Sequence, residues 1–517
     1  MASCAKRGTI YGGHKDTIPP VMKWSEPKNY TTQFKGNTIK LTFDEYVVIK
    51  DVNKQLIVSP PMETPPVITP SNASKTITIK FKDSLQPNTT YSLNFGQSIK
   101  DFNEGNPYHQ FKYVFSTGNY IDSLQLRGSI KDALEKKTDN FVSVMLYEID
   151  EKFTDSIIYK EKPRYVTNTL DSSTTFNFEN VKAGKYLLIA LKDANNNFKF
   201  DPKTDKIGFY NQPITLPDNT LYELELFKET APFKTLKPSQ SSGNKITMGY
   251  EGDVKGMEVS IKKGNNILPS RITKLTNKDS VQIWFPKTKA DSLQVTIKNG
   301  NYTKEYFVKT KDQKADTLAI STNITGSIPF RKHFTVKTST PIENIDKSKI
   351  QLINKDSISV EFGLKRNDFD QELIFDFEKE PLQKYQVTLL PEAITDMFGN
   401  KNDSIHFKFS TKNTSEFGNL KVLLENVKSF PVIVELTDDK GNVLASEYSE
   451  GATTINFNLL EPNLFTLRLI YDENKNKQWD SGSYLEKKQT EEVIYFPKAI
   501  DVRTNWDVEQ PFILPNQ

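Results

Sequence analysis

The sequence has very little of the chemistry on which most catalytic and metal sites depend. Its 517 residues include one cysteine and four histidines. A single cysteine excludes a disulfide within the chain, and the histidines lack the spacing of zinc ligands. There is also no Gly-x-Ser-x-Gly motif, no His-Glu-x-x-His motif and no phosphate-binding loop. The usual signatures of serine hydrolases, zinc proteases and nucleotide-binding proteins are therefore missing.

Neither one sign of charge nor long apolar runs dominate the chain. Lys and Arg number 68 against 65 Asp and Glu, a net charge of +3. A nucleic-acid surface needs clustered basic residues, so we expect no nucleic-acid partner. No run approaches the length of a membrane-spanning helix. A carboxylate pair that hydrolyses glycosides needs no fixed spacing, so an enzyme of that class stays open as an alternative.

The apolar residues that are present follow the period of β-strands. Residues 76–81, 295–297 and 358–362 alternate apolar with polar side chains, as half-buried strands do. Asn-, Asp-, Gly- and Pro-rich turns separate such runs, while helical periodicity is confined to a short stretch at 131–137. The pattern predicts an all-β chain of antiparallel sandwiches.

Two parts of the sequence are duplicated. An Ile-x-Asp motif, a Gly-Asn pair and a Phe-Ser-Thr triplet occur in the same order twice, at 99–101, 105–106 and 115–117, and again at 394–396, 399–400 and 409–411. Asp followed by Gly-Asn predicts an Asx-type turn with one positive-φ position. Further along, residues 176–201 align without gaps on 455–480, and the shared polar positions are Asp193, Asn195, Asn197 and Asp201 with Asp472, Asn474, Asn476 and Asp480.

The duplications predict a tandem array of about five Ig-like or transthyretin-like β-sandwich domains with the order A-B-C-A′-B′. The expected boundaries are a tether at 1–16, then A at 17–118, B at 119–228, C at 229–323, A′ at 324–412 and B′ at 413–517. Each domain is close to the usual size of an immunoglobulin-like sandwich. Domain C is expected to be entered through a linker at 237–243.

Domains A and A′ resemble the bacterial Ig-like domain first described in S-layer proteins. The resemblance is carried by Thr-Ile-Pro-Pro at 17–20, the Ile-x-Asp and Gly-Asn turn, and the Phe-Ser-Thr end. Domains B and B′ resemble the transthyretin-like, carboxypeptidase-regulatory type of β-sandwich, through Gly-Lys-Tyr at 184–186 and the Asp-x-Asn-x-Asn-x-x-x-Asp loop. Domain B′ keeps the loop but has Asn-Leu-Phe at 463–465. The whole array resembles Ig-like lipoproteins of the Bacteroidota, which implies an envelope location more than an activity.

The single cysteine, Cys4, follows Met-Ala-Ser at the start of the chain. Small residues before a cysteine resemble the bacterial lipobox, at which the signal peptide is cut and the thiol receives a lipid. This resemblance implies that residues 1–3 are the end of a signal peptide and that Cys4 is lipidated. Several acyl chains together make a lasting membrane anchor. The alternative is an ordinary free thiol near the terminus.

The Asp-x-Asn-x-Asn-x-x-x-Asp loops are the clearest chemical motif. Alternate carboxylate and amide oxygens can converge on Ca²⁺. The sixth position is Phe198 or Lys477 and the twelfth is Thr204 or Ser483, so neither loop is an EF-hand. The eight aspartates and asparagines therefore predict either structural Ca²⁺ sites or tight turns capped by Asx hydrogen bonds. No other cofactor is expected.

Three weaker motifs have open interpretations. Asp-Ser/Thr before an aliphatic residue recurs along the chain and marks either turns entering strands or O-glycosylation acceptors. Ser-x-x-Lys at 242–245 lies in the expected linker, which argues against a catalytic role. The four tryptophans are anchor candidates for a partner or sugar, although most tryptophans fill a core; they are Trp24, Trp284, Trp479 and Trp506.

The predicted function is that of a non-enzymatic outer-membrane lipoprotein. It would act as a scaffold or accessory subunit of an envelope complex of the outer-membrane transport or barrel-assembly type, with outer-membrane proteins as partners and the membrane bound through the lipid. The alternative is a surface adhesin or glycan-binding protein. Which face of the membrane the chain occupies stays open.

Overall fold

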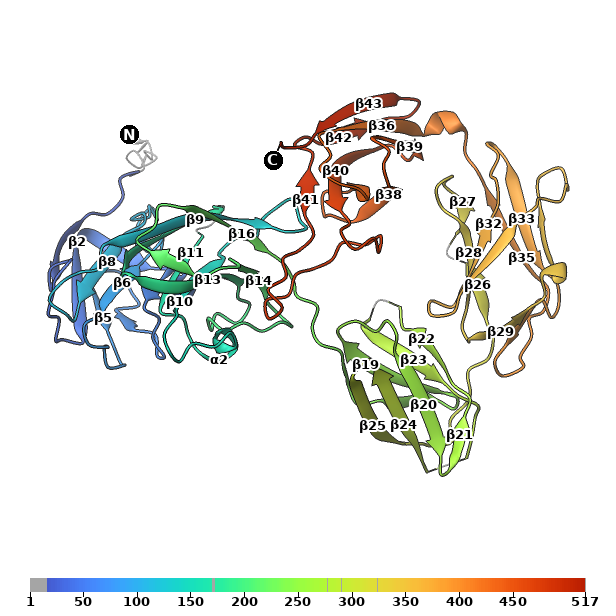
Figure 1. Ribbon diagram of the computed structural model, residues 1–517, viewed down its shortest axis with the longest axis horizontal. Coiled ribbons are helices and arrows are strands. Elements are labelled where there is room, and N and C mark those ends of the chain that lie inside the picture. Colours follow the sequence, from blue (N-terminus) through green and yellow to red (C-terminus); the bar gives the residue numbers. More distant parts are fainter. Residues whose placement is uncertain (1–15, 170–172, 277, 290, 323, 517) are drawn as a thin grey trace, which may run out of the picture. The chain divides into compact units, whose positions relative to one another are not determined.

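The computed structural model of the chain is built almost entirely from β-strands (Figure 1). It describes residues 16–169, 173–276, 278–289, 291–322 and 324–516, so Cys4 lies outside the described residues. Within these ranges the α-helices are single turns, α1 (Val52–Gln55) and α2 (Ile157–Lys160). Single 3-10 turns occur at Lys347–Lys349 and Thr414–Glu416. The predicted all-β fold is confirmed.

Separate hydrophobic cores follow one another along the chain. They draw on residues 34–115 in A, 126–226 in B, 246–308 in C, 328–409 in A′ and 420–514 in B′. The predicted tandem array of β-sandwiches is therefore confirmed. The chain divides into two compact units, one of Met1–Glu229 with Asp480–Glu491 and one of Thr230–Trp479 with Glu492–Gln517. Segment 480–491, far along the sequence, thus belongs to the first unit.

Domain A consists of two facing sheets. One has the order β1–β2–β5–β4 with β7 paired to β2, and the other has the order β3–β6–β8. In β2, Ile39 and Leu41 are buried while Lys40 is exposed, the period of two that sends alternate side chains into the core. The strands are β1 (Met22–Glu26), β2 (Thr38–Ile49), β3 (Ile57–Ser59), β4 (Val67–Thr69), β5 (Ser74–Lys80), β6 (Thr90–Asn94), β7 (Ile99–Asp101) and β8 (Lys112–Ser116).

Domain B has the sheets β11–β10–β13–β14, with β15 paired to β13, and β12–β9–β16. Strand β16 lies parallel to β9, whereas the other pairs are antiparallel. The strands are β9 (Leu124–Asp132), β10 (Ser143–Glu148), β11 (Tyr165–Asn168), β12 (Thr175–Val181), β13 (Gly184–Lys192), β14 (Lys206–Phe209), β15 (Ile214–Leu216) and β16 (Leu221–Leu226).

Domain B′ repeats this topology strand for strand. Its sheets are β38–β37–β40–β41, with β42 paired to β40, and β39–β36–β43, in which β43 lies parallel to β36. The predicted duplication of B is therefore present in the fold. The strands are β36 (Gly418–Glu425), β37 (Val432–Thr437), β38 (Val443–Ser449), β39 (Thr454–Leu460), β40 (Asn463–Tyr471), β41 (Val493–Tyr495), β42 (Ile500–Val502) and β43 (Asp507–Ile513).

Domain A′ has the sheets β26–β28–β32–β31 and β27–β35–β33–β30, with the pair β29–β34 beside them. Its strands are β26 (Ile320–Thr322), β27 (Gly326–Ser327), β28 (Phe334–Thr338), β29 (Ile342–Ile345), β30 (Ile350–Ile353), β31 (Gly363–Asn367), β32 (Glu372–Asp376), β33 (Lys384–Leu389), β34 (Ile394–Asp396) and β35 (Ile405–Ser410).

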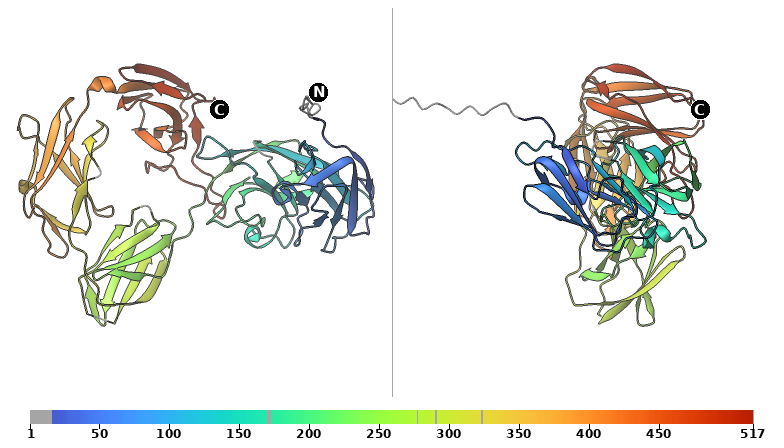
Figure 2. Two further views of the ribbon diagram at one scale, coloured as in Figure 1. Left: turned by 180° about the vertical axis from the view of Figure 1, so that it is seen from behind. Right: turned by 90° about the vertical axis from the view of Figure 1, so that its left-hand side faces the viewer.

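Domain C is a sandwich of β17–β19–β23–β22, with β18 on β19, and β21–β20–β24–β25; its two layers are visible in Figure 2. Its strands are β17 (Lys234–Thr235), β18 (Ser239–Ser242), β19 (Lys245–Glu251), β20 (Glu258–Lys263), β21 (Asn266–Leu268), β22 (Arg271–Lys274), β23 (Ser280–Trp284), β24 (Ser292–Asn299) and β25 (Tyr302–Lys309).

Domains A and A′ share side-chain contacts as well as sequence motifs. Tyr91 stacks on Phe115 with ring centroids 5.3 Å apart, and Tyr385 stacks on Phe409 at 5.6 Å. Each tyrosine hydroxyl accepts the backbone N–H of the residue five positions earlier, at 2.8 Å in both domains. These contacts show that the duplication extends to the packing of the core.

The Ile-x-Asp motifs form the predicted turns. The Asp101 carboxylate accepts three backbone N–H bonds from its own turn at 2.6 to 3.0 Å, and Asp396 accepts two in the same way. Gly105 and Gly399 have φ of 84° and 83°, a conformation that side chains disfavour. Asp and Gly therefore specify the turn together.

Three local predictions are wrong. The expected helix at 131–137 is absent, because the Asp132 side chain accepts the N–H groups of the second and third residues after it and caps a turn at the end of β9. Residues 358–362 are not a strand, because Ser357 has φ of 60° and Asn354 caps the turn around it. The expected linker at 237–243 contains β18, which pairs with β19.

Candidate functional sites

The Asp-x-Asn-x-Asn loop of domain B begins where β13 ends. Asp193 Oδ1 accepts the N–H of Asn195 at 3.0 Å, and Oδ2 accepts the N–H of Phe198 at 2.7 Å. Asn196 and Phe198 have φ of 52° and 57°, so the carboxylate holds a left-handed turn together. Burial raises the pKa of Asp193, the bond from Phe198 opposes that rise, and the charge of Asp205 adds to it.

Asp205 closes this loop and was not predicted as part of it. It is fully buried, with 0% of its surface exposed. Its Oδ2 accepts the N–H of Asp201 at 2.9 Å, and its Oδ1 accepts the N–H of Ala194 at 3.0 Å. The structure thus joins both ends of the loop through Asp205. Sequence comparison did not identify Asp205 because the gapless alignment with B′ ends at Asp201.

The loop of B′ is built in the same way. Asp472 follows β40 and is buried; its Oδ1 accepts the N–H of Asn476 at 3.1 Å and its Oδ2 accepts the N–H of Lys477 at 2.9 Å. Lys475 and Lys477 have φ of 64° and 63°. The first aspartate of each loop therefore caps backbone groups of the turn that follows it.

The predicted asparagines lie on the outside of these loops. Asn195, Asn197, Asn474 and Asn476 are all exposed. Asn197 Oδ1 accepts a backbone N–H two residues later at 2.8 Å, and Asn476 Oδ1 does the same at 2.8 Å. In the part of the chain that the structure describes, no three His, Cys, Asp or Glu side chains form a group suited to a metal ion. The arrangement supplies Asx turns, and Ca²⁺ binding stays a prediction.

Glu491 has in B′ the place that Asp205 has in B. Its Oε2 accepts the N–H of Asp480 at 3.0 Å, as Asp205 accepts that of Asp201. Asp480 and Glu491 are eleven positions apart in the sequence, whereas Asp201 and Asp205 are four positions apart. Domain B′ therefore contains seven residues more than B at this point.

The strands that follow confirm that the extra residues form an insertion. Phe209 of β14 pairs with Ile189 of β13, and Tyr495 of β41 pairs with Arg468 of β40. Ile189 and Arg468 are equivalent positions of the gapless alignment. The register of the sheet is thus the same on both sides of the insertion, which leaves the sandwich of B′ intact.

Segment 480–491 folds as a small hairpin. The N–H of Ser483 donates to the carbonyl of Lys488 at 2.8 Å, and the return bond is 2.9 Å. Gly482 lets the hairpin approach domain B, because a Cβ at this position would lie 2.7 Å from Phe227 Cζ and 2.7 Å from the Lys488 carbonyl. Only glycine fits between that ring and the hairpin.

The hairpin is bound to domain B by polar contacts along its length. The backbone N–H of Tyr484 donates to the carboxylate of Glu229, which directly follows the last residue of domain B and belongs to the same compact unit. Burial raises the pKa of that carboxyl group, and the bond from Tyr484 opposes the rise. Further contacts include Ser481 Oγ to the Lys228 carbonyl at 2.5 Å, Lys487 Nζ to Asp155 Oδ1 at 2.6 Å, and Gln489 Nε2 to the Phe209 carbonyl at 3.0 Å.

Tyr484 is the apolar anchor of the hairpin. It has no exposed surface, and its ring lies 5.4 Å from the ring of Phe209 in an edge-to-face contact. The ammonium of Lys487 lies 4.0 Å from the Tyr484 ring centroid. The buried Tyr484 hydroxyl has no hydrogen-bond partner. The side chain is therefore held by packing.

Strand β13 is buried on both of its faces. In β13, alternate side chains enter the core of B, and those between them, Leu187, Ile189 and Leu191, are also buried. Strands buried on both faces read as continuous apolar runs. The equivalent residues of B′ are Thr466, Arg468 and Ile470, and Arg468 forms a buried ion pair with Glu435 at 2.7 Å. The two strands therefore differ in the polarity of this face, which is apolar throughout in B and contains a buried ion pair in B′.

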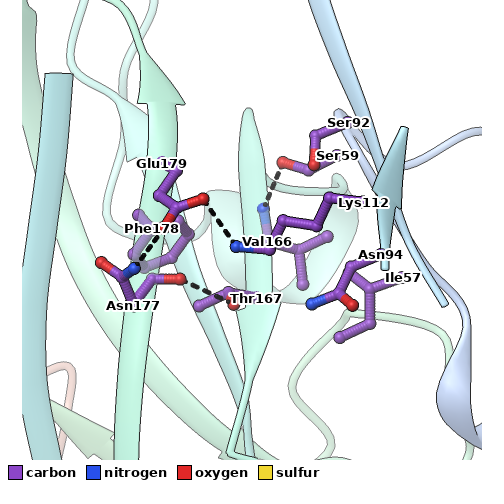
Figure 3. Close-up of a pocket in the computed structure, with 10 residues that line it drawn as sticks. All are labelled: Ile57, Ser59, Ser92, Asn94, Lys112, Val166, Thr167, Asn177, Phe178 and Glu179. Carbon is purple, nitrogen blue, oxygen red and sulfur yellow. Dashed lines mark hydrogen bonds and ion pairs between the residues drawn. The ribbon is translucent and has the colours of Figure 1, made fainter. Parts of the chain in front are cut away.

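A small cavity lies where A meets B (Figure 3). Its volume is about 20 Å³, which suits about one water molecule. Its walls carry polar contacts between the domains: Val166 N–H to Ser59 Oγ at 3.1 Å and Lys112 Nζ to Glu179 Oε2 at 2.7 Å. The cavity is an element of the domain junction and is too small for a substrate.

The Ser-x-x-Lys motif is brought together by a carboxylate. Ser242 Oγ donates to Asp316 Oδ2 at 2.6 Å, and Lys245 Nζ contacts the same oxygen at 2.9 Å. Hydrogen bonds from Ser242 and Lys245 lower the pKa of Asp316 against an opposing effect of burial. Ser242 and Lys245 thus share Asp316 as a hydrogen-bond and ion-pair partner within domain C.

The tryptophans have different environments. Trp284 is 1% exposed and donates its Nε1–H to Thr273 Oγ1 at 2.8 Å, as expected for a core residue. Trp479 is half-buried. Trp24 and Trp506 are 51% and 49% exposed, so for them the core prediction is wrong.

Family comparison matches two segments of the first unit. Residues 16–117 match the family model of the "Bacterial Ig-like domain". This is an Ig-like β-sandwich protein. Residues 134–229 of the Ig-like chain match the family model described as "Uncharacterized protein conserved in bacteria (DUF2141)". Comparison with curated proteins gives no match. No helix in the described ranges is long and apolar enough to cross a membrane.

Several solved structures share local similarity with the Ig-like chain. The surface layer protein SbsC, domains 1–6, is 11% identical over 94% of this chain and 67% of its own, with a TM-score of 0.15. Sidekick-1 immunoglobulin domains 1–4 are 8% identical over 74% and 94%, with a TM-score of 0.19. E. coli alpha-2-macroglobulin is 11% identical over 92% and 42%, with a TM-score of 0.14. These scores carry no argument about function.

Proposed function

We propose that the chain is a non-enzymatic scaffold or accessory subunit of an envelope protein complex, of the outer-membrane transport or barrel-assembly type. The proposal rests on the role of the buried aspartates in A, B, A′ and B′. Each of them accepts hydrogen bonds from backbone N–H groups of the turn that follows it, so these polar motifs stabilise the fold. An array of filled sandwiches offers side surfaces and strand edges to partners. The buried aspartates hold the turns that give those surfaces their shape.

The same proposal includes a lipid anchor on Cys4 in the outer membrane. The lipobox-like start of the sequence and the resemblance to Bacteroidota lipoproteins support this anchor. In the native host, replacement of Cys4 by Ser is expected to move the protein from the membrane fraction to the soluble fraction. Retention of the Cys4→Ser protein on membranes would contradict lipid anchoring.

Glycan binding is the second candidate, and exposed aromatic side chains of domain A favour it. Trp24, Tyr46 and Phe102 are each about half exposed. The N–H of Phe102 donates to the Tyr46 carbonyl at 2.9 Å, which places these two residues side by side. Aromatic rings on a rigid sandwich are suited to stacking on sugar rings. Glycan arrays with wild type and Trp24→Ala would detect such an activity.

A pull-down from native membranes in mild detergent, through a C-terminal tag, separates the two candidates. Stoichiometric recovery of outer-membrane barrel proteins, found by mass spectrometry, is the result expected of a complex subunit. Recovery of the chain alone would contradict the scaffold proposal and leave glycan binding. A matched pull-down with Cys4→Ser distinguishes partners bound by the sandwiches from proteins that merely share the membrane.

A further inference from the structure

We propose that the surface of domain B that holds segment 480–491 also binds the same segment of a second copy, so that the chain dimerises by exchanging this hairpin. The occupant is thus a second copy of this chain. The proposal concerns segment 480–491 and domain B alone and does not depend on membrane anchoring.

The hairpin is separable from the domain that carries it. In domain B the two residues that close the equivalent loop, Asp201 and Asp205, are four positions apart, while in B′ Asp480 and Glu491 are eleven positions apart. The strands on either side pair in the same register in both domains. The inserted residues are therefore not needed for the fold of B′, and their contacts are made with domain B.

The surface of B, in contrast, needs a cover. Phe209 and Phe227 are each at most 3% exposed with the hairpin docked, and their rings lie 6.0 Å apart beside Tyr484. Loss of the hairpin would expose these apolar side chains to water, which is unfavourable. An uncovered apolar face favours any matching occupant, and the matching hairpin of a second copy makes the same contacts.

The chemistry of the pairing is specific. Tyr484 fills the apolar position beside Phe209, and its backbone N–H needs the carboxylate of Glu229. Lys487 meets Asp155 at the rim. A rim ion pair adds orientation more than affinity. The anchor is thus a buried aromatic ring, as in most tight interfaces.

Exchange of a hairpin is a low-cost route to a dimer, because no new contact has to be created. The chain's own hairpin competes with the hairpin of a second copy for the surface of domain B. The effective concentration of a segment on a flexible tether is on the order of millimolar. Dimerisation is therefore expected to rise with protein concentration towards that range. Two hairpins cross in each dimer, one into each copy.

The test uses a full-length variant in which residues 481–490 are replaced by Pro-Lys-Thr, the sequence that domain B itself has between Asp201 and Asp205. This variant keeps the surface of B open. A fluorescent peptide of residues 480–491 is expected to bind it saturably, and the peptide with Tyr484→Ala to bind at least about tenfold more weakly. Wild type, whose surface is already covered, should bind the peptide more weakly than the variant.

Light scattering on wild type over a rising concentration series completes the test. A dimer that wild type forms and the short-loop variant does not would support the exchange. Absence of peptide binding, or a wild type that stays monomeric up to about 1 mM, would overturn it. If the short-loop variant does not fold, full-length Tyr484→Ala, which keeps the chain length, takes its place as the open surface.

Discussion

The backbone N–H of Asp480 donates to Oε2 of Glu491, eleven positions further along the sequence, at 3.0 Å. The equivalent bond in domain B, from Asp201 to Asp205, spans four positions. An equivalent hydrogen bond thus closes the loop in both domains. The segment between the two bonded residues differs between the domains in length and in what it contacts. In B′ it leaves its own sandwich and contributes Tyr484 to the surface of B.

Replacement of Gly482 by Val is expected to undock the hairpin. A Cβ at Gly482 would lie 2.7 Å from both Phe227 Cζ and the Lys488 carbonyl, and a packed ring and a backbone carbonyl cannot both move away. Limited trypsin digestion should then cleave at Lys487 and Lys488 much faster than in wild type. Gly451→Val is the matched control, since nothing lies within 4 Å of its Cβ position, and it should leave the cleavage rate unchanged.

Tyr484→Phe and Tyr484→Ala are expected to have opposite outcomes. The buried hydroxyl has no hydrogen-bond partner, so its removal leaves docking as stable or stabilises it by about 1 kcal/mol. Loss of the whole ring removes about 3 kcal/mol of packing. Hydrogen exchange of the amides of 481–490 measures both changes. Equal loss of protection in the two variants would show that the hydroxyl, and not the ring, holds the hairpin.

Alkaline pH is expected to destabilise domain B through Tyr159 of α2, whose ring centroid lies 5.5 Å from that of Phe200. Burial raises the pKa of Tyr159 to about 12, from 10.0. Above pH 10 the unfolded chain loses the Tyr159 proton while the folded chain keeps it, so stability is full below pH 10 and falls as the pH rises towards 12. Urea unfolding followed between about pH 9 and 11.5 should show the fall, and Tyr159→Phe should make it shallower.

Asp193 is expected to stabilise domain B through its turn, with or without Ca²⁺. Both carboxylate oxygens already accept backbone N–H groups, so Asp193→Ala leaves them unpaired at a cost of about 1–3 kcal/mol. The exposed Asn197→Ala should cost much less. Thermal unfolding of both variants measures this. A melting temperature of wild type that rises with added Ca²⁺ and falls with chelator would instead support the predicted Ca²⁺ site.

Periodicity and duplication were enough to predict the sandwiches, because the alternation of apolar and polar residues at 39–43 matches the alternate burial of side chains in β2. They also located Asp193 and Asp472 at the ends of equivalent strands. What they missed depends on contacts between distant residues. Asp205 and Glu491 perform one task but differ in type and spacing, so no alignment links them. The strand predicted at 358–362 failed for a local reason, since the Asn354 side chain competes with the ladder for backbone N–H groups.

Domains A and B are expected to unfold together, and Ser59 is the residue to test. Its Oγ accepts the N–H of Val166 at 3.1 Å beside the small cavity between the domains. Ser59→Ala leaves that N–H unpaired at a cost of about 1–3 kcal/mol, and it should lower the stability of both domains at once. Lys112→Ala, which removes a partly exposed ion pair with Glu179, should cost no more than about 1 kcal/mol.

Denaturant unfolding followed by hydrogen exchange separates the two domains. Amides that exchange only through one common opening event all report the free energy of that event. If Ser59→Ala lowers the protection of the amides in β6 and β10 by the same free energy, the junction therefore couples the two domains. If protection falls in only one domain, A and B are independent sandwiches and their polar junction contributes orientation without cooperativity.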